Sequence, residues 1–304
     1  NVTGIGLHSG LPSKVTIWPT KAGIGRIFVR RKKASGDYEA LRSSLSSQEA
    51  QFEKVDGAFD LDCLGAFHHL PAHISHAEFP ARLCTVLASP ADGSDKFRFQ
   101  LTEHLLSALE GCGVHNCVIE HSGPGDELPI LDGSAKTWAE LIAFAGTADA
   151  IDRHPYQLLR PSQPKRCVTV TGDDGAFVSF IPGGGEVRLT CGIDFSHKSS
   201  AIGSQWFTHV LHHEKRHGGN DDNHSSRYVQ SVSPAKTFCC YEDIDAMKSA
   251  GLIKGGGVDN ALIADGPTWV NPDMLSFPRD EQARHKVLDL VGDLALIAQG
   301  GNCA

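Results

Sequence analysis

Strand-like segments followed by paired helical segments occur twice along the chain, and this order restricts the fold more than any single motif. In the first half, short apolar runs precede amphipathic helical segments at 103–113 and 135–146. In the second half, strand candidates precede helical segments at 241–252 and 278–299. Strands that come before their helices are typical of an α+β fold. We therefore expect two α+β units, each a layered sandwich of a β-sheet and paired helices.

The chain length of 304 residues suits two domains. We place an N-terminal domain at 1–150 and a C-terminal domain at 165–304. The segment 147–164 contains three prolines and has no clear period, so it is the best candidate for a linker. With this division, we expect the active site to lie between the two domains.

Composition excludes several classes of protein. No run of about 18 apolar residues is present, so no membrane-spanning helix is expected. The formal net charge of −8 argues against a general nucleic-acid binder, because phosphate binding needs a basic surface. The nine cysteines are odd in number and include no C-x-x-C pair, which favours a reducing compartment over a disulfide framework.

The helical segment near the end of the chain carries a polar stripe. His285, Asp289 and Asp293 are spaced four residues apart, so a helix places them on one face. Apolar residues cover the adjoining faces, and the stripe therefore borders buried surface. A buried carboxylate is costly unless it is paired or bound to a metal. The spacing is compatible with a metal site and also with a simple His–Asp ion pair.

A catalytic zinc site uses about three protein ligands and leaves one position open. His104 is a candidate for the third ligand, and Glu103 stands directly before it at the start of a predicted helix. An acid beside a ligand histidine can accept the proton of an attacking water. Glu103 could equally favour the positive end of the helix dipole. The residues alone leave both interpretations open.

Two other groups of potential metal ligands have simpler explanations. The histidine-rich segment 212–228 could bind metal, but its polar, glycine-containing composition favours a surface loop. Cys112, His115 and Cys117 could hold a structural zinc ion, although their spacing is short and no fourth ligand is evident.

Seven motifs occur in one order along nearly the whole chain. They are GIGLHSG, ARLCTVL, TEHLLSAL, PILDGSA, AKTF, GLIKGGGVDNALI and ARHKVLDLVGDL. Together they resemble the UDP-3-O-acyl-N-acetylglucosamine deacetylases, the zinc amidases of lipid A synthesis. The resemblance implies hydrolysis of the N-acetyl group of UDP-3-O-acyl-N-acetylglucosamine. Details such as AIGSQWF look more like plant members, which implies a mitochondrial location if the chain is from a plant and a cytoplasmic one otherwise.

The resemblance also implies a role for each matching site residue. Zinc would be bound by His104, His285 and Asp289. Glu103 would be the general base, and Asp293 would orient a general-acid histidine. The remaining catalytic and substrate-binding roles would fall to Thr237 as oxyanion donor, Phe238 against the sugar ring, and Lys286 towards the substrate diphosphate or sugar. Because Lys286 is one position beyond His285, its side chain should point about 100° away from the metal face.

A βαβ insert of the second domain is expected at about 239–264, with a helix at 242–250. In the family this insert lines a hydrophobic passage for the acyl chain. The candidate lining residues are Ile244, Met247, Leu252 and Ile253. Amphipathic periodicity alone does not distinguish such a passage from an ordinary core face.

The main departure from the family lies at the C-terminus. The general-acid histidine belongs to a segment resembling A-Y-K-x-G-H, which these 304 residues do not contain. We therefore expect the chain to be truncated, with zinc binding retained and activity weak or absent. Loss of general acid catalysis costs about 10²–10⁴ in rate. The alternative is a catalytically inactive homologue that binds zinc and a UDP-sugar lipid, with Asp293 left without its histidine.

Overall fold

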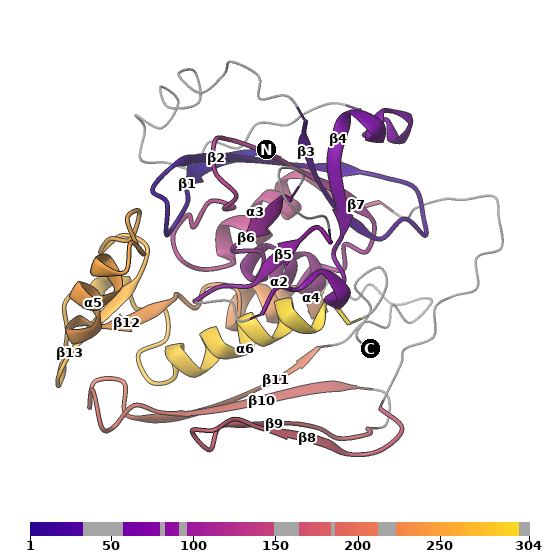
Figure 1. Ribbon diagram of the computed structural model, residues 1–304. Coiled ribbons are helices and arrows are strands. Elements are labelled where there is room, and N and C mark those ends of the chain that lie inside the picture. Colours follow the sequence, from indigo (N-terminus) through magenta and orange to yellow (C-terminus); the bar gives the residue numbers. More distant parts are fainter. Residues whose placement is uncertain are drawn as a thin grey trace.

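A computed structural model describes residues 1–32, 57–79, 83–90, 96–148, 164–183, 186–211 and 223–297. The first half is built on a five-stranded sheet in the order β1-β2-β7-β3-β4 (Figure 1). Its strands are β1 (Val2–Ile5), β2 (Pro12–Pro19), β3 (Arg26–Arg31), β4 (Phe67–Pro71) and β7 (Cys117–Ser122). Only the β3–β7 pair is parallel. Helices α2 (Glu103–Gly111) and α3 (Lys136–Ala145) pack against each other below this sheet.

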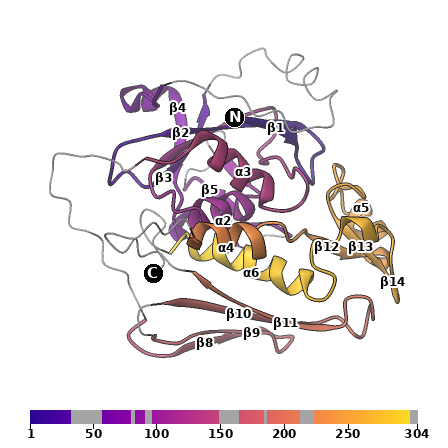
Figure 2. The ribbon, with the colours of Figure 1, turned by 180° about the vertical axis from the view of Figure 1, so that it is seen from behind.

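The second half contributes small sheets and the longest helix of the described residues. An antiparallel pair is formed by β10 (Val187–Asp194) and β11 (Ser204–Leu211), and a second pair by β8 (Val168–Thr171) and β9 (Phe177–Phe180). Helix α6 (Glu281–Leu294) packs on α2 on one side and on β10 and β11 on the other. The views from the front and from behind agree on this order of layers, sheet–helices–helix–sheet (Figures 1 and 2). The α+β fold is as predicted.

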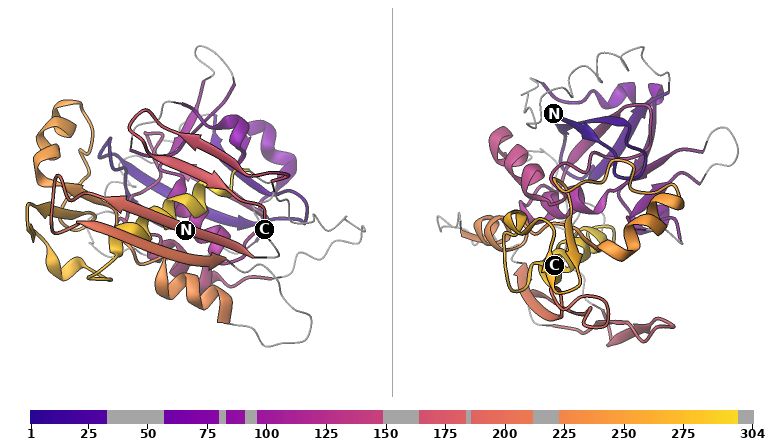
Figure 3. Two further views of the ribbon diagram at one scale, coloured as in Figure 1. Left: turned by 90° about the horizontal axis from the view of Figure 1, so that it is seen from below. Right: turned by 90° about the vertical axis from the view of Figure 1, so that its left-hand side faces the viewer.

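A βαβ unit stands at one end of the molecule (Figure 3). Strand β12 (Phe238–Cys240) and strand β13 (Leu262–Asp265) pair in parallel, and α5 (Ile244–Ser249) lies between them in the sequence. Strand β14 (Thr268–Trp269) completes the three-stranded sheet. The helix of the insert is therefore present, and it is shorter than the predicted 242–250 because 241–243 form a 3₁₀ turn.

The largest cluster of buried apolar residues contains side chains from both halves. Leu105 and Leu106 of α2 belong to it together with Val287, Leu288 and Val291 of α6. These residues repeat at helical spacing, so each helix turns one apolar face to the other. Because the two halves share this core, the domain limits 1–150 and 165–304 remain predictions.

Several elements differ from the sequence predictions. Strand β5 (Val86–Ala88) pairs with β6 (Arg98–Gln100). Residues 212–222 of the predicted surface loop and most of the predicted linker lie outside the described residues. From Asn223 the loop prediction is wrong, because α4 (Asn223–Ser231) begins there. This helix is anchored by the buried Tyr228, whose hydroxyl lies 2.8 Å from the Ser107 hydroxyl.

Within the described residues, no helix combines the length and apolar character needed to cross a bilayer.

A buried histidine stands on β7 of the five-stranded sheet. The Nε2 atom of His121 on β7 lies 3.1 Å from the main-chain oxygen of Glu127 and 3.2 Å from the Ser13 hydroxyl. Burial lowers the pKa of His121 to about 4, and the positive charge of Arg30 acts in the same direction. The folded protein therefore holds this imidazole neutral at pH values where an unfolded chain would protonate it.

This histidine should make the protein less stable in mild acid. An unfolded His121 gains a proton below pH 6.5, whereas the folded one does so only near pH 4, so stability is lost as the pH falls between these values. We expect a loss of roughly 2–3 kcal/mol by pH 4.5. The free energy of unfolding, measured with urea at several pH values, should depend less steeply on pH for His121→Gln than for the parent. His73→Gln, at an exposed 3₁₀ turn, is the control and should keep the parent's slope. An unchanged slope for His121→Gln would contradict the prediction.

Candidate active site

The site lies where the start of α2 meets the middle of α6. The two helices approach so closely that a Cβ atom on Gly292 would lie 2.1 Å from the main-chain oxygen of Glu103. Only glycine permits this contact, because the opposing atoms are backbone. The close approach brings the first turn of α2 beside the polar stripe of α6.

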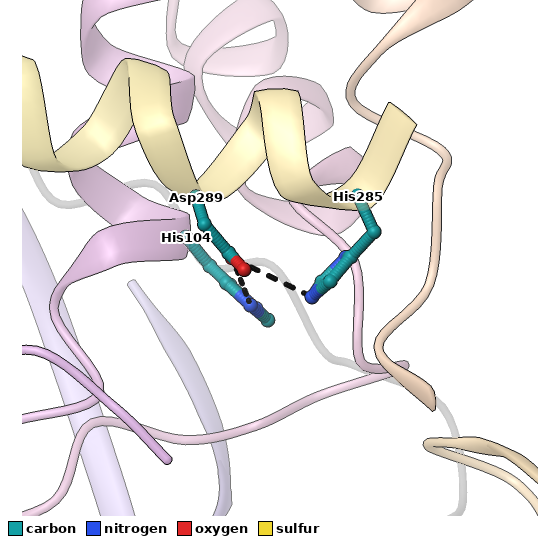
Figure 4. A group of neighbouring side chains, drawn as sticks. All are labelled: His104, His285 and Asp289. Atoms are coloured by element: carbon teal, nitrogen blue, oxygen red, sulfur yellow. Dashed lines mark ion pairs between the residues drawn. The ribbon is translucent and has the colours of Figure 1, made fainter. Parts of the chain in front are cut away.

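Three potential ligands converge at this crossing (Figure 4). The Nε2 atoms of His104 and His285 lie 3.6 and 3.5 Å from the same Asp289 oxygen, Oδ1. The potential ligand atoms of all three residues lie within 4.8 Å of one another. Both histidines are buried and Asp289 is half-buried. The i,i+4 spacing predicted the pair on α6, and the contact between α2 and α6 supplies the third residue.

The geometry and charge of this group fit a divalent metal ion. Zinc–nitrogen and zinc–oxygen bonds of about 2.0–2.2 Å place tetrahedral ligand atoms roughly 3.3–3.5 Å apart, close to the distances from Asp289 Oδ1. His285 Nδ1 lies 3.0 Å from the main-chain oxygen of Ala235 and can donate to it, which leaves the Nε2 lone pair directed into the site. Burial lowers the pKa of His285 to about 4, so the ring is neutral, as a ligand must be.

The carboxylates make the site electronegative. Burial opposes the charge of Asp289, but His285 and Lys286 hold its pKa well below the usual range. Burial also lowers the pKa of His104, yet the carboxylates of Asp289 and Glu103 outweigh it and raise the pKa. A buried cluster with this excess of negative charge favours a cation.

Glu103 is buried at the first position of α2. Its Oε2 atom accepts a hydrogen bond from the main-chain N–H of Thr85 at 2.9 Å. Burial raises the pKa of Glu103 to about 7, and the negative charge of Asp289 adds to the increase, although His104 opposes it. A carboxylate with such a pKa can accept a proton near neutral pH.

The segment that carries Thr237 and Phe238 is held by the turn before α3 and by the first residue of α6. The Thr237 N–H donates to the Gly133 oxygen at 2.8 Å, and the Lys236 N–H donates to the buried carboxylate of Glu281 at 3.0 Å. Gly133 has φ +79° and leaves no room for a Cβ atom, which would lie 1.9 Å from the Asn260 oxygen. These contacts place Thr237 and Phe238 at the wall of a cavity that the ligand group also lines.

Lys286 differs from the expectation that it points away from the metal face. Its Nζ donates to Asp289 Oδ2 at 2.9 Å, the oxygen that does not face the histidines. The same nitrogen lies 5.6 Å from the centre of the Phe238 ring. The long, flexible lysine stem turns back to pair with the acid three residues later. Asp289 also raises the pKa of Lys286, so the amine stays charged.

Asp293 has a partner that sequence reasoning missed. The Thr85 hydroxyl donates to Asp293 Oδ1 at 2.6 Å. Thr85 and Asp293 are 208 positions apart in the sequence, so no local pattern could have predicted the contact. The motif ARLCTVL contains Thr85, and this was the only signal available.

All of these groups line one cavity of about 640 Å³. The insert supplies apolar side chains to it, among them Ile244, Met247 and Ile253. Leu252, which was expected beside them, is not among the described lining residues. Cys84 also lines the cavity, and burial together with Glu103 raises the pKa of its thiol to about 12. The cavity therefore joins a polar end at α6 to an apolar end at the insert.

Within the described ranges, only His104, His285 and Asp289 form a group that could hold a metal ion. No such group is formed in these ranges by the ligand atoms of Cys112, His115 and Cys117. Burial raises the pKa of Cys112 to about 11 and that of Cys117 to about 12, which favours protonated thiols. The structural zinc interpretation of these three residues is wrong.

Two histidines and a carboxylate beside a buried acid are typical of metal-dependent hydrolases. The family model described as UDP-3-O-acyl N-acetylglycosamine deacetylase matches residues 58–301. The chain belongs to this family of enzymes that hydrolyse an amide. The resemblance predicted from the motifs is confirmed.

Plant and cyanobacterial relatives are similar over nearly the whole chain. A protein of Arabidopsis thaliana named "Probable UDP-3-O-acyl-N-acetylglucosamine deacetylase 1, mitochondrial" is 36% identical over 309 residues, which cover 99% of this chain and 77% of the relative. A UDP-3-O-acyl-N-acetylglucosamine deacetylase of Nostoc sp. is 37% identical over 298 residues, which cover 97% and 85%. The protein of that name in Thermosynechococcus vestitus is 35% identical over 295 residues, covering 97% and 81%.

Proposed function

We propose that this protein is a zinc-dependent deacetylase of lipid A biosynthesis. It would remove the N-acetyl group from UDP-3-O-acyl-N-acetylglucosamine, yielding UDP-3-O-acyl-glucosamine and acetate. The observation that carries the proposal is the buried Glu103 beside three potential ligand atoms that lie within 4.8 Å of one another. The names of the relatives supply the substrate.

The residues that would hold zinc are His104, His285 and Asp289. When bound there, zinc would act as a Lewis acid on water and on the amide carbonyl. Glu103 would take one proton from the water whose oxygen attacks the acetyl carbon. Thr237 would donate its hydroxyl to the oxygen of that carbonyl as negative charge develops on it. The carbon–nitrogen bond then breaks, the sugar nitrogen gains a proton, and acetate leaves.

The other wall residues would bind and orient the substrate. Lys286, with its charged amine beside Asp289, would face the diphosphate or sugar, and the Phe238 ring would pack on the sugar. Ile244 and Met247 would contact the acyl chain, because they form the apolar end of the cavity. Asp293 would orient the general-acid histidine that protonates the leaving amine.

Removal of the metal should abolish turnover. We expect the purified protein to contain about one zinc ion per chain, since the described residues contain one three-residue site. Dialysis against a chelator should reduce acetate release to background, and added Zn²⁺ should restore it. The measurement is mass spectrometry of the UDP-sugar product together with metal analysis. Full activity in metal-free protein would contradict zinc dependence, and binding of substrate without acetate release would support an inactive homologue instead.

A further inference from the structure

Thr85 stands between the two acids of the site, just before β5. Its main-chain N–H donates to Glu103 Oε2 at 2.9 Å, and its hydroxyl donates to Asp293 Oδ1 at 2.6 Å. Its main-chain oxygen accepts hydrogen bonds from the N–H and the hydroxyl of Thr102, at 3.4 and 3.3 Å. One residue therefore links an acid of α2 to an acid of α6.

The backbone on both sides of this link has an unusual conformation. Leu83 has φ 61° and Leu101 has φ 63°. Each leucine is two positions before a linked residue, Thr85 in one case and Glu103 in the other. Positive φ is uncommon for leucine and persists only where the surrounding structure enforces it. The surrounding structure thus fixes both segments, and the hydrogen bond from the Thr85 N–H to Glu103 joins them.

We propose that Thr85 is a positioning residue for the deacetylation reaction, acting through Asp293 and Glu103. The inference rests on the proposed function. A hydroxyl that donates to a carboxylate at 2.6 Å makes a strong, charge-assisted hydrogen bond. Asp293 is exposed, so without this bond its carboxylate could rotate into solvent. The threonine hydroxyl holds Asp293 in the orientation it needs beside the substrate, while the main-chain N–H holds Glu103.

Replacing Thr85 by valine tests the role of the hydroxyl. Valine keeps the shape and the main-chain N–H, so only the bond to Asp293 is lost. We expect kcat to fall roughly 10- to 100-fold, the range typical for residues that support a metal site by hydrogen bonds from outside the ligand set. KM, zinc content and Tm should stay close to the parent's, because water can replace the hydroxyl at the exposed Asp293. Thr85→Ser restores the hydroxyl and should bring kcat back to within about 3-fold of the parent.

The coupling between Thr85 and Asp293 separates positioning from packing. In an Asp293→Ala background, Thr85→Val should lower kcat by less than about 2-fold, since alanine has no oxygen to accept the threonine hydroxyl and the two changes then remove the same interaction. If the losses in kcat caused by the two substitutions multiplied in the double variant, the proposal would be overturned. A Thr85→Ser variant as slow as Thr85→Val would also overturn it. Thr190→Val is the matched control, because its hydroxyl pairs with that of Thr208 on the β10–β11 sheet, and it should keep the parent's kcat.

A structural readout distinguishes failure of this inference from failure of the proposed function. If the zinc-loaded parent releases no acetate, the proposed function fails, and crystal structures of the variants then decide the role of Thr85. We expect the Asp293 carboxylate to keep one orientation in the parent and in Thr85→Ser, and to change it in Thr85→Val. The same orientation in all three structures would overturn the inference.

Discussion

Replacement of Glu103 by glutamine should reduce kcat by about 10²–10⁴ while zinc remains bound. Glutamine has the same shape, and its oxygen can still accept the Thr85 N–H that now lies 2.9 Å from the carboxylate. It cannot accept a proton at neutral pH, however, so the attacking water would lose its base. His104, His285 and Asp289 are unchanged, and metal content should therefore stay at the parent's value.

The measurement for Glu103→Gln is the rate of acetate release, with metal analysis of the same sample. Glu120→Gln is a suitable control, because Glu120 is a half-buried acid on β7 that accepts a hydrogen bond from the Trp18 ring nitrogen. It should leave the rate unchanged. A Glu103→Gln variant within about 10-fold of the parent would mean that another group takes the proton.

Sequence periodicity was sufficient for the helices that build the site. The repeat of apolar residues located α2 and α6, and the four-residue spacing placed His285 and Asp289 on one face. His104 could not be joined to them by spacing, because it comes from another helix about 180 positions away. The family resemblance supplied that link, and the contact between α2 and α6 agrees with it.

Contacts between distant segments could not be predicted in this way. The hydrogen bond from Thr85 to Asp293 depends on how the two halves of the chain pack, and Lys286 turns towards Asp289 because a flexible side chain follows the nearest charge. Helix α4 escaped prediction because its sequence is polar, and the contact of its buried Tyr228 with α2 cannot be read from a local pattern. Tertiary packing overrides weak local patterns in each of these cases.

Replacement of Gly292 by alanine should damage both stability and activity. The new Cβ atom would lie 2.1 Å from the Glu103 oxygen and 2.8 Å from its carbonyl carbon, and backbone atoms cannot move aside without shifting α2. Overpacking typically costs about 1–3 kcal/mol, and the better helix propensity of alanine returns only about 1 kcal/mol. Because a 1 Å displacement of a catalytic group can cost about 10² in rate, kcat/KM should fall by roughly that factor.

Thermal unfolding and acetate release would measure these two effects of Gly292→Ala. Gly65→Ala is the matched control, since a Cβ atom there meets nothing within 4 Å and the backbone has no positive φ. It should keep the parent's Tm and rate. A Gly292→Ala protein with both values unchanged would mean that α2 and α6 do not approach at this residue. A lower rate with an unchanged Tm would mean that α2 moves without loss of packing, and that the distance from Glu103 to the ligand group is what the glycine protects.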